Sequence, residues 1–283
     1  MKRYLYILAG LAVATSLFSC EKDKYGTEAG NDSTPNIVLN VFSASLPNDP
    51  DCDAVVRFAA NNATTDVYYF AELKSEKEKR NLSDEAYADY VVANGTKLNV
   101  EKNAFDGSFV ADAVLKNLYY DNIISAVAVG KSSRSMSSAT FTGLKWNTIC
   151  TGTYTFTVLS SLLPKKEGVK LQVQESDQTQ YRFKDLYGEG HNLNFFTIDK
   201  SATDDLGTYK YVRIPVQGTG VSHKTYGAIS VRDVGYWQGN DSFITDRGFE
   251  SCLYENYTCF MYAQYYVSAR NLGYKYDKFV PDN

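Results

Sequence analysis

Short segments in which polar and apolar residues alternate recur along most of this 283-residue chain, and they constrain its fold more than any other feature. In the clearest of them, residues 152–158, threonines alternate with Tyr154, Phe156 and Val158. A period of two places one set of side chains on each face of a β-strand. The chain also contains 23 tyrosines and only 3 methionines, and tyrosine is favoured on half-buried strand faces. The sequence therefore predicts a mainly β protein.

The first part of the chain, residues 36–147, is predicted to form an antiparallel, immunoglobulin-like sandwich. Its strand patterns are short and are separated by Asn, Asp and Gly, as is typical of such sandwiches. The predicted strands cover residues 37–42, 53–60, 67–73, 123–129 and 138–142.

One short helix interrupts this pattern. Leu82, Ala86 and Tyr90 recur at helical spacing. Ser83 is suited to cap the helix at its N-terminus, and Gly95 is suited to end it.

The second part, residues 148–283, is predicted to form another antiparallel β domain, either a barrel or a twisted sandwich. Its strands follow one another at the even spacing that hairpins produce. They are predicted at residues 152–158, 170–175, 180–185, 195–199, 211–216, 226–231, 259–266 and 274–280.

The N-terminus has the layout of a cleaved secretory signal: a basic start, an apolar run over residues 5–13, and small or apolar residues before Cys20. The run is too short for a membrane-spanning helix, which needs about 20 apolar residues. The ending Leu17-Phe18-Ser19-Cys20 resembles the lipobox of bacterial lipoproteins. This resemblance implies removal of residues 1–19, acylation of Cys20 (palmitate among the acyl chains) and a lipid-anchored protein of the outer membrane.

Residues 20–35 are rich in Gly, Asn, Asp, Ser and Thr and show no apolar periodicity, which predicts a flexible tether. Glu21 and Asp23 resemble the export signal of Bacteroidetes surface lipoproteins, which implies a position on the cell surface. The tripeptide beginning at Asp32 resembles the O-glycosylation motif of exported Bacteroidetes proteins, with Ser33 as the acceptor.

Both predicted domains also carry family resemblances. Residues 118–129 with Thr140 resemble the last strands of a fibronectin type III domain, although the early tryptophan of that family is absent. Residues 152–155, 169–174 and 181–188 resemble a C-terminal β domain of Bacteroides surface lipoproteins, with Leu186 in place of the usual proline. The second resemblance implies fold and location and brings no catalytic residue with it.

Charge and cysteine content narrow the function classes. The net charge is −4 without clusters of Lys and Arg, which argues against a nucleic-acid partner. Besides Cys20 there are four cysteines, an even number that permits disulfides in an exported protein. Cys252 and Cys259 are spaced to close a hairpin, and buried free thiols are the alternative. The four are Cys52, Cys150, Cys252 and Cys259.

The sequence does not support a catalytic, cofactor or metal site. Gly130-Lys131-Ser132 lacks the preceding glycine and the following helix of a phosphate-binding loop. No Gly-x-Ser-x-Gly elbow is present, and His191 and His223 each stand alone in a predicted loop. Asp49, Asp51 and Asp53 alternate as calcium ligands can, but without the glycine and distal glutamate of an EF-hand, so we interpret them as a solvated loop. Asp204 and Asp205 are interpreted in the same way.

Two predicted loops that carry aromatic residues, 236–241 and 254–257, are the best indication of a ligand. Large rings beside amides and carboxylates suit sugar binding, because sugar faces stack on rings while polar groups bind hydroxyls. The alternative is that these rings cap the end of the β core. The platform residues are Tyr236, Trp237, Asn240, Asp241, Tyr254 and Tyr257.

Three functions fit these observations. The favoured one is a non-catalytic surface lipoprotein that binds glycan and works with an outer-membrane uptake partner. The second is a structural or adhesive protein that binds a protein partner, which predicts an exposed sheet edge or apolar patch. The third is a hydrolase with two facing carboxylates roughly 5–10 Å apart.

Overall fold

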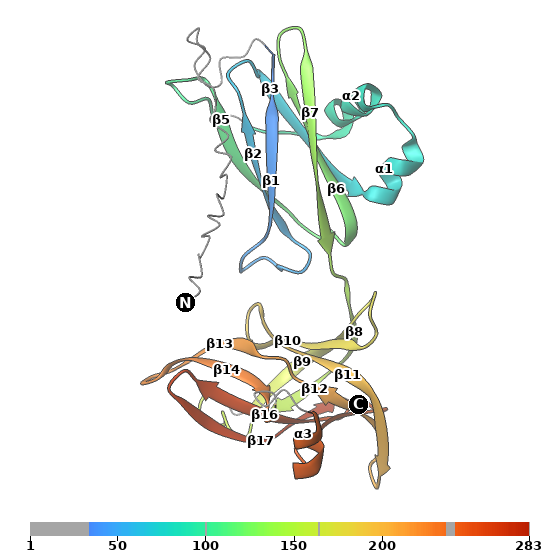
Figure 1. Cartoon of the computed structure of the whole chain (residues 1–283), viewed down its shortest axis with the longest axis vertical. Helices are drawn as coiled ribbons and strands as arrows, with labels where there is room; N and C mark the ends of the chain where they lie inside the picture. The colour runs from blue at the N-terminus through green and yellow to red at the C-terminus, as the bar shows by residue number, and fades with distance from the viewer. Residues whose placement is uncertain (1–33, 100, 164, 236–240, 283) are drawn as a thin grey trace, which may run out of the picture.

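The computed structural model describes residues 34–99, 101–163, 165–235 and 241–282. Figure 1 shows two β bodies that follow one another along the long axis of the molecule. The mainly β prediction is confirmed. No helix among these residues has the length and apolar character needed to cross a membrane.

The first body is a sandwich of two antiparallel sheets. One sheet has the order β1-β2-β5 and the other β4-β3-β6-β7. Side chains from both inner faces fill the space between them, among them Val56, Phe58 and Ile124, all fully buried. The strands are β1 (Ile37–Ser43), β2 (Ala54–Ala60), β3 (Asp66–Leu73), β4 (Thr96–Lys97), β5 (Phe109–Leu115), β6 (Tyr120–Val129) and β7 (Arg134–Gly143).

Two helices, not the single one predicted, lie between β3 and β4: α1 (Lys74–Arg80) and α2 (Asp84–Asn94). The predicted ends of α2 are correct, since the Ser83 hydroxyl accepts the N–H of Ala86 and Gly95 is the C-cap. The sequence pattern missed α1 because none of its seven residues is apolar and none is buried.

The second body is a closed barrel of eight strands. Its ring closes because β17 pairs with both β8 and β16. A hairpin of β13 and β14 extends the barrel by pairing with β16, and α3 (Asp241–Arg247) precedes β15. The strands are β8 (Trp146–Thr155), β9 (Lys165–Gln174), β10 (Gln180–Gly188), β11 (His191–Asp204), β12 (Gly207–Arg213), β13 (Gln217–His223), β14 (Gly227–Asp233), β15 (Ser251–Tyr254), β16 (Cys259–Val267) and β17 (Arg270–Pro281).

Aromatic rings pack the barrel interior. The Phe183 ring lies 5.1 Å from that of Tyr154, 5.2 Å from Phe195 and 4.8 Å from Phe279, measured between centroids. All four side chains are almost completely buried. Part of the tyrosine content therefore serves the core, as the strand preference of tyrosine indicates.

The sandwich strands end at Gly143, and the first barrel strand begins at Trp146. Trp146 and Asn147, which the sequence assigns to the first domain, are thus the first residues of β8. Only Leu144 and Lys145 separate β7 from β8, so the two bodies are connected by a very short segment.

Candidate functional site

A hollow of about 570 Å³ on the outer wall of the barrel, next to α3, is the best candidate site. We call it the aromatic hollow, because it is lined by the rings of Tyr209, Tyr211, Tyr254, Phe260 and Tyr276. These rings come from four neighbouring strands, β12, β15, β16 and β17. Its size and its apolar lining with few polar groups are typical of small-ligand sites.

Strand alternation explains why the rings gather there. In β15 and β16, Leu253, Cys259 and Met261 point into the barrel core, so the residues between them point outward. Tyr254 and Phe260 are among these outward residues. The same period of two turns Tyr209 and Tyr211 of β12 to the hollow.

The five rings form a continuous chain of contacts. Centroid distances are 5.4 Å for Tyr211 to Tyr209, 5.0 Å for Tyr209 to Tyr254 and 6.0 Å for Tyr254 to Phe260. Phe260 lies 6.4 Å from Tyr276. Tyr254 is only 5% exposed and forms part of the floor, whereas Tyr276 is 43% exposed at the rim. The rim ring is therefore open to a stacking ligand.

Two carboxylates stand beside the rings, and both are held by hydrogen bonds. Asp204 Oδ2 accepts the Tyr254 hydroxyl at 2.6 Å, which lowers the pKa of Asp204. Glu250 accepts from Arg213 Nη1 and from the Thr245 hydroxyl, each at 2.7 Å. A general acid at neutral pH needs a raised pKa, so Asp204 is poorly suited to that role.

The structure brings one predicted platform residue, Tyr254, to this hollow. Tyr254 is not in a loop as the sequence suggested, but is buried in β15. Tyr257 is 40% exposed in the turn after β15 and is not part of the hollow lining. Asp241 is the first residue of α3, whose C-terminal end borders the hollow. Tyr236, Trp237, Asn240, Cys20 and Ser33 lie outside the described residues.

Sequence reasoning missed Tyr209, Tyr211 and Tyr276. A signal was present, because Tyr-x-Tyr occurs at residues 209–211, which overlap the start of one predicted strand, and at residues 274–276, within another. That spacing puts both tyrosines of each pair on one face of a strand. The spacing alone does not show that the tyrosine-bearing faces of the two strands lie side by side.

The chain matches no protein-family model, no curated protein and no solved structure. The geometry of the aromatic hollow is therefore the basis for inferring its function.

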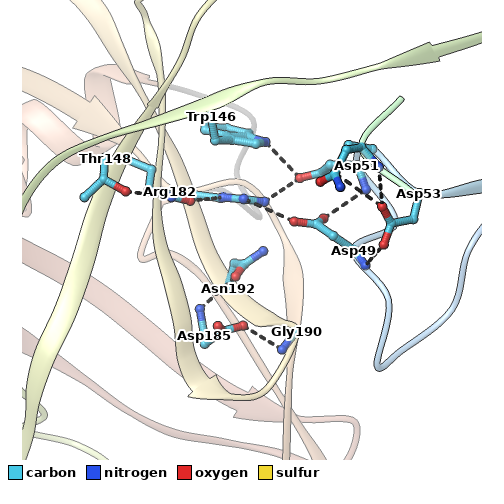
Figure 2. Close-up of polar contacts among 12 residues, drawn as sticks. Asp49, Asp51, Asp53, Trp146, Thr148, Arg182, Asp185, Gly190 and Asn192 are labelled. Atoms are coloured by element: carbon cyan, nitrogen blue, oxygen red, sulfur yellow. Dashed lines mark hydrogen bonds and ion pairs between the residues drawn. The ribbon is translucent and has the colours of Figure 1, made fainter. Parts of the chain in front are cut away.

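A polar cluster joins the sandwich to the barrel (Figure 2). It corrects the interpretation of Asp49 and Asp51 as residues of a solvated loop. Arg182 of β10 is 3% exposed and donates to Asp51 at 2.6 Å and to Asp49 at 3.4 Å. Asp53 is buried and accepts the backbone N–H groups of Asp49 and Asn117. In the part of the chain that the structure describes, no group of three or more His, Cys, Asp or Glu is arranged to hold a metal ion.

Arg182 is also held by a ring and by a side-chain amide, and Figure 2 shows how Trp146 lies beside it. Its guanidinium lies 4.5 Å from the Trp146 ring centre, and its Nε donates to Gln172 at 2.8 Å. The Trp146 indole N–H donates to Asp51 at 2.9 Å. Burial raises the pKa of Asp51, while the charge of Arg182 opposes that shift.

Another polar contact connects the sandwich and the barrel beside this cluster. Glu175, which follows β9, accepts from the Tyr120 hydroxyl of β6 and pairs with Lys145 at 2.9 Å. These hydrogen bonds, with that of Tyr120 the strongest influence, lower the pKa of Glu175 to about 2. Two groups of polar contacts thus hold the sandwich on the barrel.

The four described cysteines are free thiols. A bond between Cys252 and Cys259 is excluded by their faces, since Cys259 lies in the barrel core and Cys252 lines the aromatic hollow. Burial raises the pKa of Cys252 to about 11, so its thiol stays protonated at neutral pH.

Both histidines pack against neighbouring residues. His191 packs directly against the backbone of Gly220. His223 accepts the N–H of Thr225 through Nδ1 and stacks on Tyr226.

Proposed function

We propose that this chain is a surface lipoprotein of the Bacteroidetes type, anchored in the outer membrane through Cys20, that binds glycan without catalysis. The aromatic hollow is the binding site, and the protein hands its ligand to an outer-membrane uptake partner. The observation that carries the proposal is the chain of five contacting rings, flanked by carboxylates with fixed positions. Rings supply stacking surfaces, and oriented polar groups supply hydrogen bonds to hydroxyls.

The position of the hollow supports a role in presenting a site away from a membrane. At the start of the described structure, the Thr34 carbonyl accepts from Asn61, beyond the end of β2. The opposite end of the sandwich, with Asp49 and Asp51, contacts the barrel. β11 begins beside this contact and ends at Asp204 in the hollow, on the side where Figure 1 shows α3. The start of the described structure and the hollow thus lie at opposite ends of the molecule.

The test is a screen of the full chain, in detergent, against a panel of polysaccharides by calorimetry. Tyr276→Ala is expected to weaken binding roughly tenfold, because the exposed rim ring is lost, at a cost of about 1.4 kcal/mol. Tyr226→Ala is the matched control, since Tyr226 is 39% exposed but lies on the β13–β14 hairpin. Trp237→Ala tests the loop platform separately. Absence of binding to every glycan, or equal loss in the control, would remove the proposal.

A protein-binding, adhesive role is the alternative, and one feature favours it. The outer face of the β1-β2-β5 sheet exposes four apolar side chains, Val38, Phe42, Val110 and Val114. Val110 is 64% exposed. Exposed apolar patches often mark protein interfaces. This face is on the sandwich, so Val110→Ser should leave glycan binding unchanged and reduce binding only to a protein partner.

A further inference from the structure

A bulge with two extra residues in β11 directs a lysine toward the aromatic hollow. The β11–β12 register pairs Thr197 with Val212 and next pairs Ser201 with Lys210. β11 therefore has two more residues than β12 between these pairs. Bulges of this kind commonly turn a side chain toward a functional site.

The side chain redirected in this way is that of Lys200. Its ammonium lies 4.9 Å from the ring centre of Tyr211 and 3.4 Å from the hydroxyl oxygen of Thr245. Both of these residues line the aromatic hollow. A cation thus stands at its edge.

Lys200 also lines a second hollow of about 380 Å³ at the bulge. Lys210 lines the same hollow, together with Thr179, Thr197 and Ser201. Asp199 is the one carboxylate in this lining, and it is exposed. With two lysines against one aspartate, the lining carries a net positive charge, which suits a small anionic group.

The charges of the two lysines are not taken up by neighbouring carboxylates. Asp204 accepts from Tyr254, and Glu250 is paired with Arg213. Among the described residues, neither Lys200 nor Lys210 forms an ion pair. Ammonium groups without a carboxylate partner favour binding of an external anion.

We infer that the ligand is an acidic polysaccharide, whose sugar ring stacks in the aromatic hollow while its carboxylate or sulfate binds at Lys200 and Lys210. This inference rests on the glycan-binding function proposed above. Lys200 acts as the residue that selects acidic over neutral saccharides.

The experiment compares acidic and neutral polymers that share a backbone, using the full chain in detergent. Polygalacturonate is paired with its methyl-esterified form, and dextran sulfate with dextran, which separates carboxylate from sulfate recognition. We expect at least tenfold tighter binding of one acidic polymer, weakening as salt is raised. Lys200→Met should remove most of that preference and leave neutral binding unchanged. Lys170→Met, an exposed lysine of β9, is the matched control.

Each of the other outcomes of this experiment would overturn the inference. Equal affinity for acidic and neutral polymers, or an acidic preference that survives Lys200→Met combined with Lys210→Met, overturns the inference and leaves the proposed glycan binding standing. Failure to bind any saccharide overturns both. Because Lys200 and Lys210 are exposed, their substitution should not unfold the chain, which circular dichroism of each variant checks.

Discussion

Replacing Arg182 with methionine is expected to lower the free energy of unfolding by about 3 kcal/mol, which is the lower end of the cost of breaking a buried ion pair. The substitution leaves Asp49 and Asp51 without their cation and Gln172 without its donor. The lower end applies because the two carboxylates keep 26% and 30% exposure, while the Arg182 side chain keeps 3%. Urea denaturation of the full chain measures the effect.

A surface ion pair provides the matched control. Arg57 and Asp112 form two hydrogen bonds of 2.8 Å, but their side chains are 54% and 43% exposed. Arg57→Met should therefore cost much less than Arg182→Met, because solvent screens this exposed pair. If Arg182→Met cost no more than Arg57→Met, the contact between the two bodies would be energetically unimportant.

Arg182→Met should also change how the bodies are held. The guanidinium that lies on Trp146 and binds both aspartates would be gone, and the contacts of Glu175 would remain. We expect small-angle scattering to show a wider range of arrangements for the variant. Arg182→Lys keeps the charge but not the fork of donors, so it should fall between the wild type and Arg182→Met.

The sequence predicts those parts of the fold whose signal is local. The alternation at residues 152–158 marks the second part of β8, which ends at Thr155, and Ser83 and Gly95 mark the ends of α2, because each depends on neighbours in the chain. α1 has no apolar residue, so its formation depends on tertiary context and no periodicity reveals it.

The candidate site and the contact between the bodies depend on residues far apart in the sequence. Arg182 and Asp51 are separated by 131 positions, and nothing near either residue indicates the other. The alternating aspartates therefore suggest a solvated loop or a calcium loop until the position of Arg182 is known. The aromatic hollow similarly requires the pairing of β12 with β15, which brings Tyr209 beside Tyr254 across 45 positions of the sequence.

A buried carboxylate in the barrel provides a second large effect, one that depends on pH. Asp277 is fully buried, and its Oδ2 accepts the Tyr265 hydroxyl at 2.6 Å, with the Tyr154 hydroxyl at 3.4 Å. Its Oδ1 accepts the N–H of Thr157 at 2.7 Å. Burial raises the pKa of Asp277 from 3.8 to about 6, although these hydrogen bonds oppose the shift.

The sign of the effect follows from proton linkage. Because the pKa is higher in the folded chain than in the unfolded one, the folded state binds the proton more tightly. The stability from this group is fully present below about pH 4 and is lost as the pH rises through about 6. A shift of about two units corresponds to about 3 kcal/mol between these limits.

Asp277→Asn should remove this dependence, because the amide does not titrate and its Nδ2 can donate to the two tyrosine hydroxyls. The unfolding free energy of the variant minus that of the wild type should rise by about 3 kcal/mol from pH 4 to pH 8. Urea denaturation of both proteins at intervals of one pH unit measures it, and groups that titrate in both cancel in the difference. Tyr265→Phe keeps the carboxylate but removes a hydrogen bond that lowers its pKa, so its pH dependence should move to higher pH. A difference between Asp277→Asn and the wild type that stays constant with pH would mean that Asp277 keeps an ordinary pKa in the barrel.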